Sequence, residues 1–173
     1  MKLNRNMRSV HRRLALVVAA PFLVTAGTGI LLLVKKQVPW VQPPEKKGEG
    51  RVPAISFERI LEAARSAPEA GIAGWEDVDR LDVRPGKGVA KVQGVNRWEV
   101  QVDLATGEVL QTAYRRSDLI ESLHDGSWFH PDAKLFVWLP AGLCVFVMWV
   151  TGVWMFFYTR WRRHVVAARK ADA

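Results

Sequence analysis

The sequence predicts an α+β domain, one helix on a small antiparallel sheet, inserted between two transmembrane α-helices. Residues 14–34 and 135–159 are long apolar runs without a charged side chain. At 1.5 Å per residue they reach roughly 31 and 37 Å, against a hydrocarbon core of about 30 Å. Between them, one helical pattern precedes several short alternating segments. Runs of this length and apolarity predict membrane spans, and the segment between them predicts a folded extramembrane domain.

The distribution of charge predicts the topology. Residues 1–13 carry five basic side chains and 160–173 carry five more against one acidic, whereas 35–134 have 15 basic and 16 acidic residues. Basic residues beside the ends of the spans follow the positive-inside rule. We therefore expect a protein of the bacterial inner membrane with both tails in the cytoplasm and the central domain in the periplasm. Because topology accounts for the net charge of +8, the sequence does not predict nucleic-acid binding.

A cleaved signal peptide is the alternative for the first apolar run. Val24-Thr25-Ala26 has the small residues of a cleavage site. The apolar run continues to Val34, however, beyond what a cleaved peptide needs. We expect a retained first span.

The middle of the chain divides into three predicted parts. Residues 35–52 are a proline-rich linker. Residues 53–116 form the domain, with Ser56 as the N-cap of a helix and later segments that alternate apolar and polar residues, which predicts one buried and one wet sheet face. Residues 117–134 are an interfacial segment, expected to lie flat at the outer membrane surface.

The strand and turn at 98–110 (WEVQVDLATGEVL) resemble the signature of a PepSY domain. Residues 8–12 (RSVHR), Thr28-Gly29 and residues 123–126 (LHDG) resemble motifs of PepSY-associated transmembrane proteins. The resemblance covers almost the whole chain and implies a short, two-span form of that family. It also implies that iron-regulated inner-membrane proteins and ferric-siderophore reductases carrying b-type haem are relatives.

Four histidines are the candidate haem ligands: His11, His124, His130 and His164. Two are predicted at each membrane face, as a transmembrane electron path through haem b would require. His11 and His124 match the family motif. The alternative interpretation makes them interfacial cationic or helix-terminal residues. Two helices cannot enclose a porphyrin, so haem binding would need a homo-oligomer or a partner subunit.

Other chemistry has little support in the sequence. It contains no Gly-rich nucleotide loop and no Cys-x-x-Cys, and His124 with His130 lacks carboxylates at metal-ligand spacing, so we predict no metal site. These absences favour a protein that is not an enzyme. Small residues that let helices approach closely are predicted at four positions: Thr25, Gly29, Gly142 and Gly152.

Three functional hypotheses follow. The first is an accessory subunit, embedded in the lipid bilayer, that docks or stabilises a membrane redox or iron/siderophore-handling partner. The second is a haem-binding electron-transfer protein, or component of a ferric reductase, that acts as an oligomer. The third is a peptidase-binding or inhibitory module in the periplasm.

Overall fold

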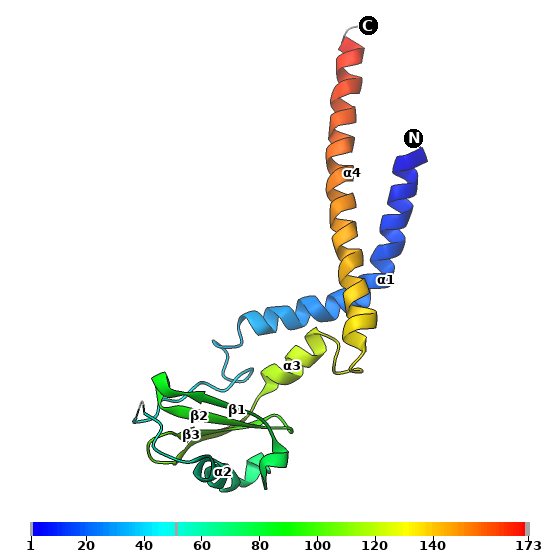
Figure 1. Cartoon of the computed structure of the whole chain (residues 1–173). Helices are drawn as coiled ribbons and strands as arrows, with labels where there is room; N and C mark the ends of the chain where they lie inside the picture. Colours follow the sequence, from blue (N-terminus) through cyan, green and yellow to red (C-terminus); the bar gives the residue numbers. More distant parts are fainter. Residues whose placement is uncertain (1, 51, 172–173) are drawn as a thin grey trace. The chain divides into compact units, whose positions relative to one another are not determined.

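The computed structural model describes the backbone of residues 2–50 and 52–171, and the side chains of residues 7–50, 52–162 and 164. The chain divides into two compact units, Met1–Gly29 with Ser122–Ala173, and Ile30–Glu121. The predicted basic side chains at Lys2, Arg5, Arg163, Arg169 and Lys170 lie outside the described residues. The predicted architecture is confirmed: an apolar helix, a four-stranded antiparallel sheet with small helices, and a second apolar helix (Figure 1).

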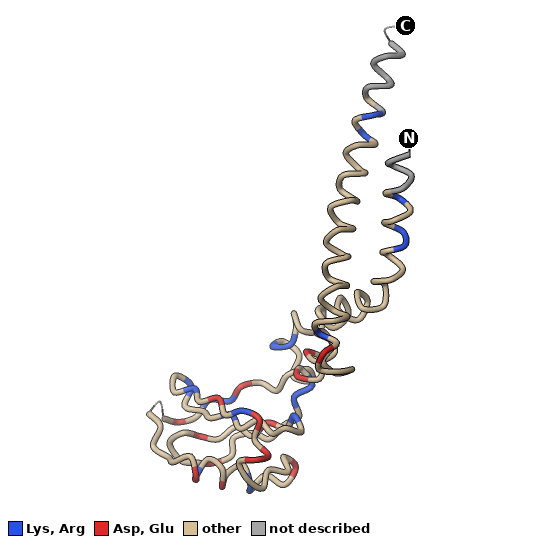
Figure 2. Tube along the Cα trace, turned by 45° about the vertical axis from the view of Figure 1, so that its right-hand side comes forward, with Lys and Arg blue, Asp and Glu red and all other residues tan. Residues whose placement is uncertain are grey.

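The first unit contains α4 (Leu139–Ala171) and most of α1 (Lys2–Leu33), whose last residues, from Ile30 on, belong to the second unit. Their apolar stretches, Met7–Leu33 and Lys134–Arg162, are long enough to cross a membrane, and almost none of either stretch is buried by protein. These two helices indicate a membrane protein. In Figure 2 most of both stretches is free of charge, whereas charges of both signs are spread over the folded unit.

Two prolines shape the long helices. Pro21 lies inside α1, and α1 bends about midway along its length (Figure 1), as expected where a proline removes a helical hydrogen bond. A π-helical turn, η4 (Lys134–Trp138), precedes α4. Pro140 follows it and has no N–H for the carbonyl four residues earlier, which is a common setting for such a local irregularity.

The second unit is a four-stranded meander covered by one helix. The strands are β1 (Val78–Arg84), β2 (Val89–Gly94), β3 (Trp98–Asp103) and β4 (Val109–Tyr114), and each pairs antiparallel with the next. A short 3₁₀ turn, η3 (Pro85–Lys87), connects β1 to β2, and two others, η1 (Pro68–Ala70) and η2 (Trp75–Asp77), precede β1.

The covering helix is α2 (Phe57–Arg65), and its predicted cap is present. The Ser56 hydroxyl accepts a hydrogen bond from the Arg59 N–H at 3.2 Å. Ile60, Leu61 and Ala64 of α2 are buried against the apolar face of the sheet. The spacing i, i+1, i+4 places all three on one side of a helix, which explains why this short segment docks there.

The opposite face of the sheet is also buried, contrary to the prediction of a wet face. Glu99, Gln101 and Asp103 are only 2%, 1% and 1% exposed. An extended segment, residues 41–50, covers them and is hereafter the strap. The polar face can be buried because the strap supplies hydrogen-bond partners. Gln101 accepts from the Lys46 N–H at 2.7 Å and donates to the Pro44 carbonyl at 3.2 Å. The segment predicted as a free linker is therefore bound to the domain over most of its length.

Helix α3 (Arg116–His124) begins in the folded unit. Ser117 is fully buried, and its N–H donates to the Val41 carbonyl at 2.7 Å, which ties the start of α3 to the strap. The final turn of α3 and the residues after it belong to the unit of the long helices. The predicted interfacial segment thus starts as part of the domain.

Candidate functional site

The candidate site consists of the contacts that two histidines make with the long helices. His124 lies at the end of α3, and its Nδ1 is 3.0 Å from the Thr28 hydroxyl of α1. A Cβ on Gly29 would lie 3.4 Å from the His124 ring. The Thr28-Gly29 pair therefore supplies both a hydrogen-bonding partner and the space for the imidazole.

A second threonine fixes the backbone at the same place. The Thr25 hydroxyl donates to the His124 carbonyl at 3.3 Å and accepts from the Trp138 indole N–H at 3.1 Å. Trp138 also packs closely on Gly126, whose φ of 81° favours glycine, and a Cβ on Gly126 would lie 2.4 Å from that ring. The side chains of α1 and η4 thus hold the His124 segment from two sides.

His11 makes the same kind of contact near the other end of the helices. Its Nδ1 is 3.3 Å from the Thr151 hydroxyl of α4, and a Cβ on Gly152 would lie 3.7 Å from its ring. Each of these two histidines therefore meets a Thr-Gly pair on a long helix. The contacts repeat the same chemistry between segments that are far apart in the sequence.

The hydrogen bonds of the threonines favour one tautomer of both histidines. The Thr28 hydroxyl lies 2.6 Å from the Val24 carbonyl, and the Thr151 hydroxyl lies 2.9 Å from the Val147 carbonyl. Because each hydroxyl has one proton and donates it to a carbonyl, it can only accept from a histidine. In this tautomer Nδ1 carries the ring proton and Nε2 carries a free lone pair.

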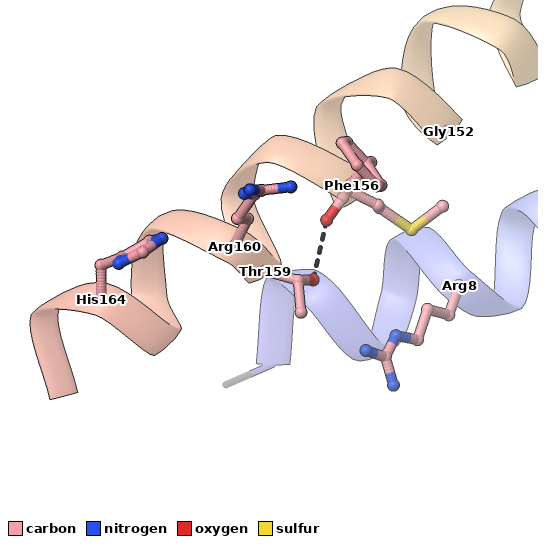
Figure 3. A pocket seen from close by; sticks show the side chains of 7 residues that line it. Arg8, Gly152, Phe156, Thr159, Arg160 and His164 are labelled. Carbon is pink, nitrogen blue, oxygen red and sulfur yellow. Dashed lines mark hydrogen bonds between the residues drawn. The ribbon is translucent and has the colours of Figure 1, made fainter. Parts of the chain in front are cut away.

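The other two histidines do not join these contacts. The His130 side chain is 68% exposed and interacts locally with Asp132. His164 is exposed on α4 and lines a pocket of about 760 Å³ with Arg8 and Arg160 (Figure 3). The structure therefore does not bring His130 to His124 or His164 to His11. Within the described residues, no group of three or more His, Cys, Asp or Glu side chains is placed to hold a metal ion.

An apolar groove of about 660 Å³ lies beside His11. Ala15, Val18 and Ala19 of α1 and Met148 of α4 are among its lining residues. Two of its lining residues, His11 and Met148, have side chains that could bind a metal ion, through an imidazole nitrogen and a thioether sulfur. The groove therefore offers apolar surface next to a histidine whose Nε2 is free.

Three of the four predicted helix-contact residues lie at contacts. Thr25, Gly29 and Gly152 meet Trp138, His124 and His11, as described above. Gly142 differs, because nothing within the described part of the chain would lie within 4 Å of a Cβ added there. Its notch on α4 is open.

The family described as the PepSY-associated TM region matches residues 8–172. The chain belongs to this family. No curated protein and no solved structure matches it. The two-span form predicted from the sequence agrees with the two apolar helices of this PepSY-associated protein.

Sequence reasoning missed one group of polar residues in the PepSY-associated chain. Arg80, Lys91, Gln93 and Arg115 line a polar cavity on the strap side of the sheet. The signal was available, since the polar members of β1 and β2 alternate with apolar residues in register. The same alternation predicts a solvated face, because the sequence does not reveal what covers it.

Proposed function

We propose that this protein is an accessory subunit of the bacterial inner membrane whose spans dock a membrane redox or iron/siderophore-handling partner. In this proposal both termini are cytoplasmic and the folded domain is periplasmic. The basic tails support the orientation through the positive-inside rule. Membership of the PepSY-associated family supports a membrane role.

One observation carries the docking proposal, namely an open face on α4. Gly142, Phe146, Trp149 and Val153 recur at helical spacing, and the last three are 62%, 64% and 39% exposed. Hydrophobic burial does not drive association inside lipid, where helices associate by close packing at small residues. Large aromatic side chains beside an open glycine notch are suited to interlock with a helix of another membrane protein.

Site-specific photo-crosslinking in native membranes tests this proposal. A photoreactive residue at Trp149 should crosslink to a redox or iron-handling membrane protein. The same residue at Trp154, which is 59% exposed and lies roughly 140° further around the helix, is the matched control and should crosslink mainly to lipid. Filling the notch with Gly142→Leu should remove the crosslink.

Three outcomes would contradict docking at this face. Equal crosslinking from positions 149 and 154 would show that the face is not distinguished. A crosslink only to a second copy of this chain would replace the partner with a homo-oligomer. A crosslink from position 149 that Gly142→Leu leaves unchanged would exclude the notch.

The free Nε2 atoms favour a second candidate function, haem b binding by an oligomer. A metal-bound imidazole commonly donates its other ring N–H to an acceptor, and Nδ1 of His11 and of His124 does so toward a threonine. The apolar groove beside His11 fits the surroundings of a porphyrin. Nε2 of His11 or His124 would hold the haem iron, and a second chain would supply the other ligand. Haem would supply one-electron transfer when bound.

A pyridine haemochromogen assay on protein expressed with ample haem tests this candidate. One haem per chain, lost on His11→Ala or His124→Ala and retained on His130→Ala, would promote electron transfer above docking. A protein that retains its haem after both the His11 and His124 replacements would exclude these ligands.

A further inference from the structure

We infer that the folded domain binds a small carboxylate that also carries a hydroxyl or ammonium donor, in the cavity between the strap and the sheet. The cavity has a volume of about 210 Å³. At about 30 Å³ per molecule of liquid water, this equals the volume of roughly seven waters. It lies entirely within the folded unit and is independent of any docking by the spans.

Three neighbouring strands build the floor of the cavity. Lys91 and Gln93 of β2 are 5% and 8% exposed, and Glu99 of β3 is 2% exposed. Arg80 and Arg84 of the edge strand β1 are exposed and form its rim. The cavity therefore has a buried polar floor that is accessible from one edge of the sheet.

The carboxylates around the cavity are already hydrogen-bonded. Glu99 accepts from Arg115 and from Gln101, and Asp82 accepts from Arg84 at 2.8 Å. The Glu45 carboxylate of the strap accepts from Arg84 and, at 2.6 Å, from Lys87. Asp118 accepts from Arg115 and Gln93. These carboxylates therefore need few further hydrogen bonds from a ligand.

The Lys91 ammonium is the group whose hydrogen bonds are missing. Its nearest carboxylate oxygen, on Glu45, is 3.8 Å away, which exceeds hydrogen-bond distance. Among the described residues no acceptor is hydrogen-bonded to this ammonium, although it has three N–H donors. Arg80 uses one N–H on Gln93, at 2.6 Å, and presents the remainder of its guanidinium at the rim. Lys91 is a largely buried residue that has only this long ion pair to Glu45 and no hydrogen-bonded acceptor, so the floor favours an anionic, acceptor-rich ligand.

Gln42 of the strap sets a second requirement. Its side-chain oxygen is buried and has no hydrogen-bond donor among the described residues. Gln42 lines the same cavity as Lys91. A ligand that satisfies both must place a carboxylate near Lys91 and Arg80 and a donor near Gln42. An α-hydroxy or α-amino carboxylate has these two functions on adjacent atoms.

Four probes of nearly equal size separate these requirements. L-Lactate and L-alanine carry both a carboxylate and a donor, propionate lacks the donor, and L-alaninamide lacks the carboxylate. Titration calorimetry on the purified full-length protein should give a Kd of about 1 mM or lower for lactate or alanine. Propionate should bind about tenfold more weakly, because Gln42 would stay unpaired, and alaninamide should not bind.

Lys91→Met is the deciding variant, and Lys87→Met is its matched control. Both remove one positive charge next to Glu45, but Lys87 does not line the cavity. Lys91→Met should weaken binding tenfold or more, and Lys87→Met should change it less than about twofold. Gln42→Leu should remove the preference for lactate over propionate. Circular dichroism and thermal unfolding without ligand establish that each variant is folded, and Arg80→Gln at the exposed rim replaces Lys91→Met if the latter does not fold.

Several results would overturn the inference. Absence of binding of both lactate and alanine at about 20 mM, more than tenfold above the expected Kd, would assign the cavity to water only. Unchanged binding by folded Lys91→Met, or by Arg80→Gln where that variant replaces it, would exclude this cavity as the site. Equal affinity for propionate and lactate would exclude the role of Gln42.

Discussion

The two faces of the sheet are buried to the same degree by opposite means. On one face Val100 and Val102 are 0% exposed beneath α2, and on the other Gln101 and Asp103 are 1% exposed beneath the strap. The first face is stabilised by the removal of apolar surface from water. The second depends on each polar group finding a partner, because an unpaired buried polar group costs free energy. The two faces should therefore respond differently to mutation.

The largest expected effect is at the charge pair of the polar face. Arg115 donates to Glu99, and their side chains are 12% and 2% exposed. Burial alone would lower the pKa of the Arg115 guanidinium, but the neighbouring Glu99 carboxylate raises it above its ordinary value. Arg115→Met leaves the Glu99 charge buried with fewer partners and should reduce the free energy of unfolding by about 4 kcal/mol. Denaturant titration of the full-length protein in detergent measures the change.

A double variant sharpens this test. Replacing Glu99 with Leu in the Arg115→Met background removes the unpaired charge and should restore part of the lost stability, because an apolar pair of similar volume can replace a buried ion pair. A double variant less stable than Arg115→Met would show that the two faces do not differ in this way.

The apolar face should lose somewhat less from a single truncation. Ile60 is 2% exposed under the sheet, and Ile60→Ala should cost about 3 kcal/mol through lost burial and a residual cavity. Phe57→Ala on the same helix is the control, since Phe57 is 61% exposed and should cost less than about 0.5 kcal/mol. Similar losses at both positions in thermal unfolding would contradict the assigned buried side of α2.

Asp103 should make the stability of the polar face depend on pH. Burial would raise the pKa of its carboxyl, but the backbone N–H groups of Glu49, Thr106 and Ala105 outweigh burial and lower it. The carboxylate therefore stabilises the fold above the unfolded-state pKa of about 3.9, and this contribution is lost as the pH falls through the folded-state pKa.

Asp103→Asn tests this contribution. An amide has one oxygen and cannot serve both the Glu49 N–H and those of Ala105 and Thr106, so we expect a loss of about 2 kcal/mol at pH 7. The variant and the parent should converge in stability as the pH falls below 4. A difference that persists unchanged at acid pH would show that the charge of Asp103 is not responsible.

The smallest effect is expected at the surface of the strap. Lys87 and Glu45 form an ion pair at 2.6 Å, but the Lys87 side chain is 48% exposed. Lys87→Met should lower the midpoint of thermal unfolding by an amount equivalent to less than about 1 kcal/mol. A larger loss would mean that the strap depends on its exposed ion pairs more than on its backbone hydrogen bonds to Gln101 and Asp103.

The sequence by itself determined the elements that follow from local patterns. The two uncharged apolar runs predicted the spans, and Ser56 with the spacing of Phe57, Ile60, Leu61 and Ala64 predicted α2. The helix is confirmed, but Phe57, which this spacing placed on the buried face, is 61% exposed. The alternation after Trp98 predicted β3. These predictions succeeded because hydropathy, periodicity and capping depend on residues close together in the chain.

Only the tertiary structure decided which polar residues are buried and which histidines have partners. Glu99 and Gln101 are typical of a solvated face until the strap, more than 50 residues earlier, covers them. His11 and His124 each meet a Thr-Gly pair that the sequence places about 140 and 96 residues away. A polar side chain is stabilised by its partner rather than by its own hydropathy, and the partner is set by how distant segments pack.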